Sequence, residues 1–233
     1  AKRSHDNAEK AWEAGHHQKE VVPVEIEPDF KMIKKDNGIR SGTPIEKLTK
    51  LKPAFDKKHG TLTAANSSFL TDGSAVCLIM TESKAKELGF TPKAEIVDYC
   101  FTGQRLEDEL LLGPAYAMSK VLDQTKLSLN DIDVFEIHEA FAGQVLTNIK
   151  CLADDEFCKI ELQKEKPVGE IDINKVNKWG GSLSIGHPFG ATGARLLTTA
   201  ANRLIEENGQ YAMLSACAAG AHGHAMIIKK YEG

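Results

Sequence analysis

From about residue 61 onward, short apolar runs alternate with stretches of helical periodicity. Short apolar runs bounded by polar residues and glycine are typical of strands, whereas apolar residues three and four positions apart indicate an amphipathic helix. The segments that predict strands are residues 75–80, 93–101, 131–137, 211–217 and 223–231. The segments that predict helices are residues 82–89, 114–124, 139–152 and 194–209. This alternation predicts a layered α/β fold with a five-stranded sheet.

The last two predicted strands, 211–217 and 223–231, are separated by only five residues. A crossover between parallel strands needs about a dozen residues or more, so this connection is too short for one. We therefore expect an antiparallel hairpin, which makes the sheet mixed.

The first 60 residues have a different character and are rich in charge, glycine and proline. They contain an amphipathic helix at 1–15, an edge strand at 21–26 and a short helix at 44–51. A second polar stretch, 153–176, is expected to be a connection. The chain opens on Ala-Lys-Arg, with no initiator methionine and no targeting pattern, and we expect it to be part of a longer protein.

Composition and charge narrow the class of protein. The 233 residues are 42% hydrophobic and 27% charged, which suffices for a buried core, and the net charge of −4 disfavours nucleic acid as a partner. No apolar run approaches the roughly 18 residues that a membrane-spanning helix needs, so membrane association is expected to be peripheral at most.

The five cysteines form neither a CxxC pair nor a dense disulfide framework, a pattern that indicates reduced thiols in an intracellular compartment. Four of them, Cys77, Cys100, Cys151 and Cys158, fall inside predicted strands or on a helix and its exit, and we interpret them as structural.

Candidate chemistry gathers where predicted strands end and helices begin. His138 follows a strand, His187 precedes a helix, and Cys217 ends a strand before the glycine-containing loop 218–223. Ligands of open α/β sheets bind beyond the carboxyl ends of strands and at helix N-termini. The three residues are therefore candidates for one site.

The neighbours of two candidates support acid–base chemistry. Glycine and other small residues after Cys217 allow a ligand to approach backbone N–H groups, as an oxyanion hole requires. His187 stands between Gly186 and Pro188, which restrict its backbone, and a helix start behind it disfavours the charged imidazole. We expect His187 to be a neutral base, the alternative being a solvated histidine in an ordinary turn.

Two other kinds of site find little support. A zinc site could be built from His187, Cys217, His222 and His224. The sequence contains no CxxC pair, HExxH motif or cluster of carboxylates that would support it, so we do not favour a zinc site. The segment GHPFGATG has neither the GK[ST] ending of a phosphate loop nor the GxGxxG spacing of a dinucleotide site.

Four stretches in a fixed order resemble motifs of the thiolase family, the enzymes that cleave or condense 3-oxoacyl-coenzyme A. They are TLTAANSSFLTDG (61–73), HEAFAG (138–143), NKWGGSLSIGHPFGATGAR (177–195) and SACAAGAHGHAM (215–226). His138 stands where many thiolases have asparagine. The HEAF form of this motif, together with LKPAF (51–55), resembles the thiolase subunits of mitochondrial β-oxidation complexes.

The resemblance implies a domain organisation. Thiolases have two similar halves and a loop domain inserted in the first, and this chain resembles the later part. On that basis residues 1–60 end the loop domain, 61–92 supply the last strand and helix of the first half, and 93–233 form the C-terminal half. The cysteine that receives the acyl group would then lie outside this chain.

The resemblance also implies roles for individual residues. His187 would take the proton of the acyl-accepting cysteine, and Cys217 would exchange a proton with the acetyl-CoA carbanion. His138 would stand in the oxyanion hole for the enolate, and the N–H of Ala219 would supply one donor of a second hole. Ser68 matches a serine that contacts pantetheine, and Arg40 would meet the nucleotide end of CoA.

The function implied is thiolytic cleavage of 3-oxoacyl-CoA in fatty acid β-oxidation, with coenzyme A as a substrate and neither a metal nor another cofactor. The implied partners are a second copy of the chain, contacted through the first half, and an α-subunit of a mitochondrial complex. The alternative is a non-catalytic module that binds CoA thioesters or assembles subunits.

Overall fold

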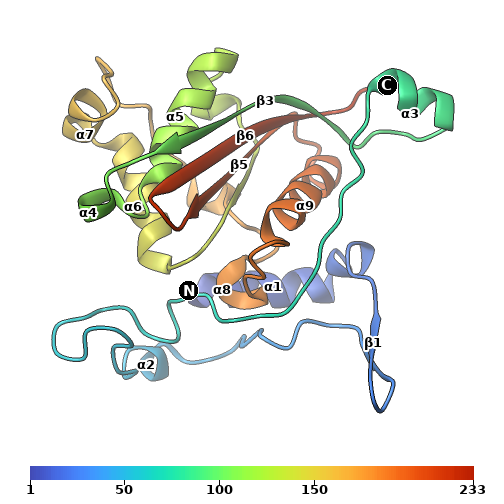
Figure 1. The fold of residues 1–233 in the computed structure, drawn as a ribbon, viewed down its shortest axis with the longest axis horizontal. Coiled ribbons are helices and arrows are strands. Elements are labelled where there is room, and N and C mark those ends of the chain that lie inside the picture. Colours follow the sequence, from blue (N-terminus) through green and yellow to red (C-terminus); the bar gives the residue numbers. More distant parts are fainter. The chain divides into compact units, whose positions relative to one another are not determined.

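The computed structural model describes all 233 residues, which form two compact units. One comprises Ala1–Gly73, Glu139–Ala142 and Asn177–Phe189, and the other Ser74–His138, Gly143–Val176 and Gly190–Gly233. We call them unit 1 and unit 2. Figure 1 labels the helices and strands.

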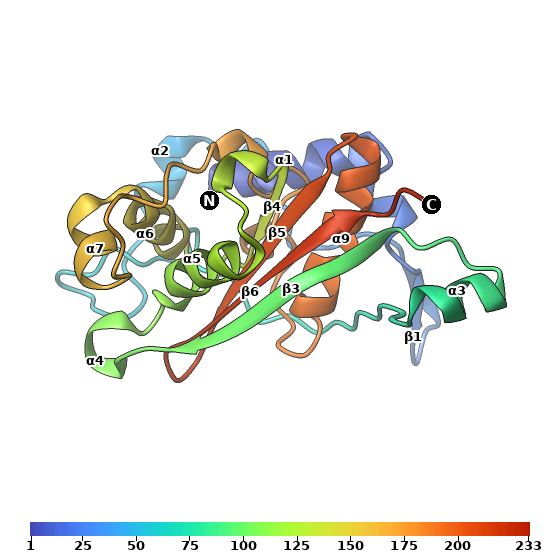
Figure 2. The same cartoon turned by 90° about the horizontal axis from the view of Figure 1, so that it is seen from above.

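Unit 2 is built on a four-stranded sheet with the order β3-β6-β5-β4 (Figure 2). The strands are β3 (Ala94–Gly103), β4 (Val134–Ile137), β5 (Tyr211–Ala218) and β6 (His222–Lys230). β4 runs parallel to β5, whereas β5–β6 and β3–β6 are antiparallel. The sheet is therefore mixed, and the expected hairpin of the last two strands is confirmed.

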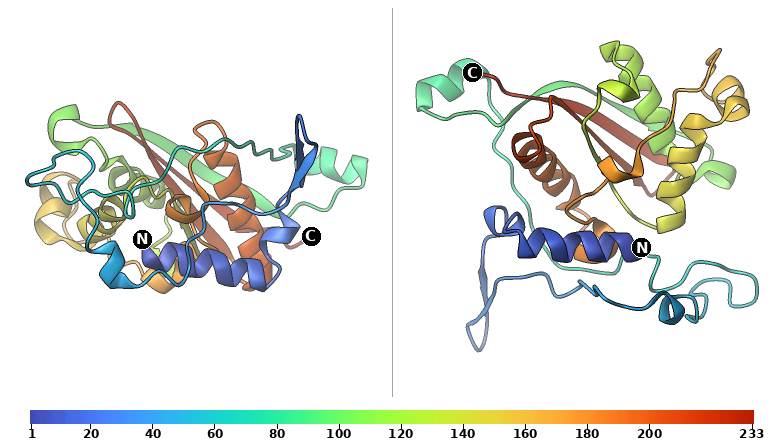
Figure 3. Two further views of the ribbon diagram at one scale, coloured as in Figure 1. Left: turned by 90° about the horizontal axis from the view of Figure 1, so that it is seen from below. Right: turned by 180° about the vertical axis from the view of Figure 1, so that it is seen from behind.

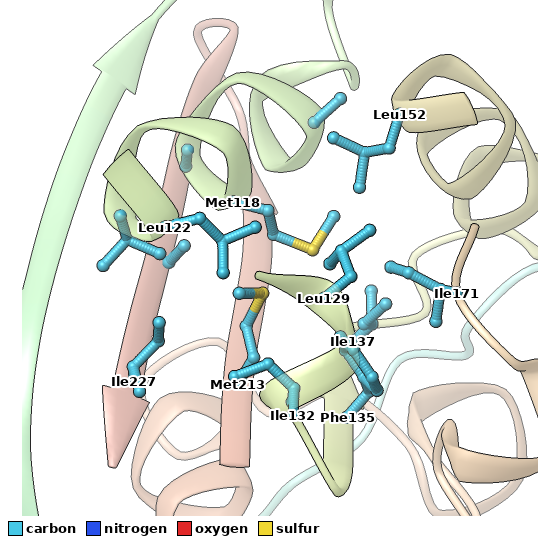
Figure 4. Close-up of a cluster of buried hydrophobic side chains, with 14 of the residues drawn as sticks. Met118, Leu122, Leu129, Ile132, Phe135, Ile137, Leu152, Ile171, Met213 and Ile227 are labelled. Carbon is cyan, nitrogen blue, oxygen red and sulfur yellow. The ribbon is translucent and has the colours of Figure 1, made fainter. Parts of the chain in front are cut away.

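Helices cover both faces of this sheet. α5 (Gly113–Thr125) and α6 (Ala142–Ala153) pack on one face, where Met118, Leu152 and Met213 contribute to the main core (Figure 4). α9 (Thr192–Glu206) packs on the other, with Leu196 and Leu204 against Leu214 and its neighbours. Met213 and Leu214 of β5 pack on opposite faces of the sheet because side chains alternate along a strand.

Unit 2 also contains three shorter helices, α3 (Glu82–Leu88), α4 (Leu106–Glu109) and α7 (Asp155–Ile160). α3 begins after the N-cap Thr81, whose side chain accepts a hydrogen bond from the Lys84 N–H, and ends at Gly89 in the left-handed conformation. α7 lies inside the stretch 153–176 that was expected to be a connection only. No helix in either unit combines the length and the apolar character needed to span a bilayer.

The prediction of a strand at 75–80 is wrong. This apolar segment forms no regular secondary structure and pairs with no other strand, and Val76 and Leu78 are 89% and 72% exposed. An apolar run shows that a segment tends to be buried, but a strand also needs a neighbour for its backbone hydrogen bonds.

The sheet accordingly has four strands, not the five predicted. Beyond β4 it continues only as a single parallel bridge between Phe135 and Val176. Asn177, the next residue, has a positive φ of 45°, and a residue in the left-handed conformation ends any strand at this point.

Unit 1 contains two antiparallel strands, three α-helices and a 3-10 helix, His17–Lys19. The strands and α-helices are α1 (Lys2–Glu13), β1 (Val24–Ile26), β2 (Lys31–Ile33), α2 (Ile45–Leu48) and α8 (Ser182–Ile185). Figure 3 shows α1 beside α8, although the two are far apart in the sequence. β2 had no counterpart among the predicted elements.

The helix expected from residue 139 begins three residues later, at Ala142. The Ala140 carbonyl accepts a hydrogen bond from the Ser68 N–H (2.9 Å), and Phe141 forms a β-bridge with Ser67. Because the backbone of 140–141 is engaged in this pairing, the HEAF segment forms a loop between β4 and α6.

Candidate active site

His138 and Cys217 lie in unit 2 at the carboxyl ends of neighbouring parallel strands. His138 directly follows β4, and its N–H donates to the Ser215 carbonyl (2.8 Å), which extends the pairing of β4 with β5. Cys217 lies two residues further along β5. His138 is 2% exposed and Cys217 is 7% exposed. The fold thus brings an imidazole and a thiol to the same edge of the sheet.

Burial determines the protonation state of Cys217. Desolvation raises the pKa of its thiol to about 11, because a thiolate loses its hydration when it is buried. At neutral pH the group is therefore a thiol that can donate a proton rather than a preformed thiolate nucleophile.

The turn after Cys217 connects β5 to β6 through residues 219–221. Ala219 is its first residue and is exposed, and Gly220 and Ala221 both have positive φ angles, 86° and 56°. Gly223, opposite Cys217 in the register, packs so closely on Gly113 of α5 that a Cβ on Gly223 would lie 2.2 Å from the Gly113 carbonyl. The turn is thereby held against the N-terminus of α5.

The two histidines of β6 have different surroundings. His222 is exposed, whereas His224 packs against Phe101 with 4.8 Å between ring centroids, and burial lowers the pKa of its imidazole. Neither unit gathers three or more His, Cys, Asp or Glu side chains in an arrangement that could hold a metal ion.

His187 belongs to unit 1 and is half-buried in the loop after α8. Gly186 before it has a φ of 93°, and a Cβ at that position would meet the Thr71 side chain at 2.2 Å. The imidazole contacts the Phe189 ring, with 4.9 Å between centroids. α9 begins at Thr192, so four residues separate His187 from this helix. That His187 acts as a neutral base stays a prediction.

Ser68 and Arg40 also belong to unit 1. Ser68 is half-buried on the segment that pairs with 140–142. Arg40 is exposed, and its guanidinium donates to the backbone carbonyls of Asn37 (2.6 Å) and Ile39 (2.9 Å). These contacts hold Arg40 to its own loop, and its role toward a nucleotide stays a prediction.

Glu139 is a site residue that the sequence analysis missed. Its carboxylate is 6% exposed and accepts hydrogen bonds from Ser4 Oγ (2.6 Å), Asn177 Nδ2 (2.8 Å) and the Leu183 N–H (3.2 Å). The only signal was its place next to His138, within a segment expected to be helical. The partners come from α1 and from the segment 177–183, both far from Glu139 in the sequence, so no local pattern indicated them.

Comparison with known proteins identifies the family. The family model "Thiolase, C-terminal domain" matches residues 90–230, and "Thiolase, N-terminal domain" matches residues 1–83. The chain belongs to the thiolase family. This thiolase chain is 54% identical over 230 residues to a "Probable 3-ketoacyl-CoA thiolase" of Caenorhabditis elegans, and 52% identical over 231 residues to "Trifunctional enzyme subunit beta, mitochondrial" of Rattus norvegicus.

These alignments cover 98% and 99% of this thiolase chain but 51% and 48% of the relatives. A similar solved structure is that of the Bacillus anthracis acetyl-CoA acetyltransferase, with a TM-score of 0.84, 38% identity, and coverage of 98% of this chain and 54% of that one. The chain therefore has the thiolase fold and spans about half the length of the relatives it matches.

Proposed function

We propose that this chain supplies catalytic groups of a 3-oxoacyl-CoA thiolase, an acyltransferase that cleaves 3-oxoacyl-CoA with CoA into acetyl-CoA and a shortened acyl-CoA. The observation that carries the proposal is the placement of His138 and a protonated Cys217 at the ends of β4 and β5 in a member of the thiolase family. The relative named "Probable 3-ketoacyl-CoA thiolase" supports the substrate class.

In this proposal Cys217 is the proton donor of the cleavage step. When the C–C bond breaks, its electron pair remains on the departing acetyl-CoA as a carbanion, and the Cys217 thiol protonates that carbon. A buried thiol with a raised pKa suits this role because it stays protonated until a strong base forms beside it.

The other candidates stabilise charge or move the first proton. His138 donates to the enolate oxygen of acetyl-CoA, and the Ala219 N–H donates to the thioester oxygen of the acyl intermediate. His187 takes the proton of the acyl-accepting cysteine, and Ser68 and Arg40 contact the pantetheine and the nucleotide of CoA. No metal or further cofactor enters this scheme.

We further propose that the acyl-accepting cysteine is not among the 233 residues. Cys100 and Cys158 are buried, Cys77 and Cys151 are partly buried, and we interpret all four as structural. The resemblance of the segment around Cys217 to a thiolase motif supports an acid–base role for that residue. The chain alone is therefore expected to be inactive. The relative named "Trifunctional enzyme subunit beta, mitochondrial" supports a mitochondrial protein that assembles with an α-subunit. A second copy of the chain is the other partner that the family resemblance implies.

The test compares the chain alone with the complete protein that contains it, using acetoacetyl-CoA and a long-chain 3-oxoacyl-CoA as substrates. We expect thiolysis by the complete protein and none by the chain. In the complete protein Cys217→Ser should abolish measurable turnover, whereas Cys100→Ser, which alters another buried thiol of the same sheet, should retain it. Robust turnover by the chain alone would refute the absent nucleophile, and full activity of Cys217→Ser would refute the proton donor.

A further inference from the structure

Glu139 is a buried carboxylate that the proposed chemistry does not use. It directly follows His138 in the chain and is 6% exposed. Burying a carboxylate is costly unless hydrogen bonds replace its hydration. Here three donors do so, a serine hydroxyl, an asparagine amide and a backbone N–H.

The carboxylate joins parts of unit 1 that are far apart in the sequence. Ser4 lies on α1, Asn177 precedes the GGSLSIGHP segment, and Leu183 lies on α8 within it. Ser4 adds a second layer of contacts, since its Oγ accepts from the Gly181 N–H (3.1 Å) and lies 3.0 Å from Ser184 Oγ.

The carboxylate is closely packed against the start of α8. A Cβ on Gly181 would lie 2.4 Å from Glu139 Oε2, so any side chain at this position would displace it. On the neighbouring Gly180 a Cβ would lie 2.5 Å from the Ala8 Cβ of α1. The two glycines let α1, Glu139 and the start of α8 approach each other at backbone distance.

The loop that carries His187 is thus held on both sides. Upstream, Glu139 binds the N–H of Leu183, four residues before His187. Downstream, a Cβ on Gly186 would overlap Thr71, and one on Gly73 would lie 2.7 Å from Pro188. The imidazole itself is not a partner of the carboxylate in this network, so any influence of Glu139 on it acts through the backbone.

We propose that Glu139 is a positioning residue whose carboxylate holds the 181–188 loop in the conformation that presents the His187 imidazole. An apolar residue of similar size often costs less stability than a buried charged group. A carboxylate, however, binds several donors in a defined geometry, and here the donors belong to α1 and to the segment 177–183. Its contribution to catalysis rests on the proposed thiolase function, but its contribution to the loop does not.

The first test uses this chain alone and needs no activity. Hydrogen exchange of the Leu183 and Gly181 amides is compared in Glu139→Gln and Glu136→Gln. Glu136 is a fully buried carboxylate three residues earlier, which forms ion pairs with Arg203 and Arg195 of unit 2. We expect exchange at both amides to accelerate at least ~10-fold in Glu139→Gln relative to Glu136→Gln, because a hydrogen-bonded amide exchanges only when it opens. Equal protection in both variants overturns the proposal.

The second test measures kinetics in the complete protein. Glu139→Gln should lower kcat by about 10- to 100-fold, the effect of a displaced catalytic group, with KM for CoA changed less than about threefold. Glu136→Gln, assayed where circular dichroism shows it folded, should keep kcat within about threefold of wild type. Unchanged kcat in Glu139→Gln despite faster amide exchange also overturns the positioning role.

Two further variants keep the proposal testable if Glu139→Gln does not fold. Ser4→Ala removes one donor to the carboxylate and also an acceptor of the Gly181 N–H, so its exchange is followed at the Leu183 amide. Exchange at this amide and kcat should change in the same direction as in Glu139→Gln, and by less. Glu139→Ala removes all three hydrogen bonds and should have the larger effect. An absence of thiolysis in the wild-type complete protein refutes the proposed function, whereas the amide-exchange result tests the loop independently.

Discussion

Raising the pH of the folded chain should leave the Cys217 thiol protonated well beyond the range in which an ordinary cysteine ionises. The side chain is 7% exposed, and desolvation is the main cause that raises its pKa from 9.0 to about 11. At pH 8 the thiolate fraction is then about 10⁻³, against about 10⁻¹ for an unperturbed thiol. The expected reactivity of Cys217 is therefore lower by about two orders of magnitude.

The assay is alkylation by iodoacetamide, followed at the Cys217 peptide by mass spectrometry between pH 7 and 10. The logarithm of the rate should rise by about one per pH unit without levelling off, since only the thiolate reacts. The same chain unfolded in urea is the control and should level off near pH 9. Circular dichroism at each pH shows that the folded sample stays folded.

The same pKa shift predicts a loss of stability at alkaline pH. Between pH 9 and 11 the unfolded chain releases this proton and the folded chain retains it, so the free energy of unfolding falls as the pH rises. A shift of two pKa units corresponds to about 3 kcal/mol, lost progressively across this range. Urea titrations at pH 7.5, 9 and 10, compared with Cys217→Ala, measure it.

A plateau in the alkylation rate of folded Cys217 at or below pH 9 would refute this reasoning. It would mean that nearby groups stabilise the thiolate more strongly than burial disfavours it. Cys217 would then be suited to nucleophilic attack rather than to proton donation.

Three substitutions test other parts of the structure. Arg203→Ala removes the fully buried guanidinium that pairs with Glu136 and leaves this carboxylate the more distant Arg195 guanidinium at 3.6 Å. The free energy of unfolding in urea should fall by about 3–5 kcal/mol, and a loss below about 1 kcal/mol would contradict this. Gly223→Ala forces a methyl group against the Gly113 backbone and should lower the free energy of unfolding by about 1–3 kcal/mol. An unchanged melting temperature would contradict this, because α5 would then accommodate the methyl group without cost. His138→Ala in the complete protein should lower kcat by about 10²–10³, the effect of one oxyanion donor, and a tenfold or smaller loss would remove it from that role.

Much of unit 2 follows from local pattern. The strands around 93–101, 211–217 and 223–231 and the helices around 114–124 and 194–209 begin and end within a few residues of where the pattern predicts them. In each, apolar side chains recur at the period of the element and face a core on the sheet, so local preference and burial agree.

The prediction failed where a segment depends on distant partners. Residues 75–80 have the composition of a buried strand, yet no strand of this chain pairs with them. Residues 139–141 have helical periodicity, yet their backbone pairs with 66–68 and the helix begins at Ala142. In both places long-range backbone hydrogen bonds, or their absence, overrode the local preference.

For the candidate site, the local pattern is enough to find His138, His187 and Cys217, because each stands at a predicted strand end or beside a loop glycine, and the resemblance to the family motifs implies their roles. The environment of each group, in contrast, follows from the three-dimensional structure alone. The high pKa of Cys217 results from its burial in the folded chain, and the hydrogen bonds of Glu139 come from α1, Asn177 and α8. Desolvation and hydrogen bonding depend on which atoms surround a group in space, and those atoms come from segments far apart in the chain.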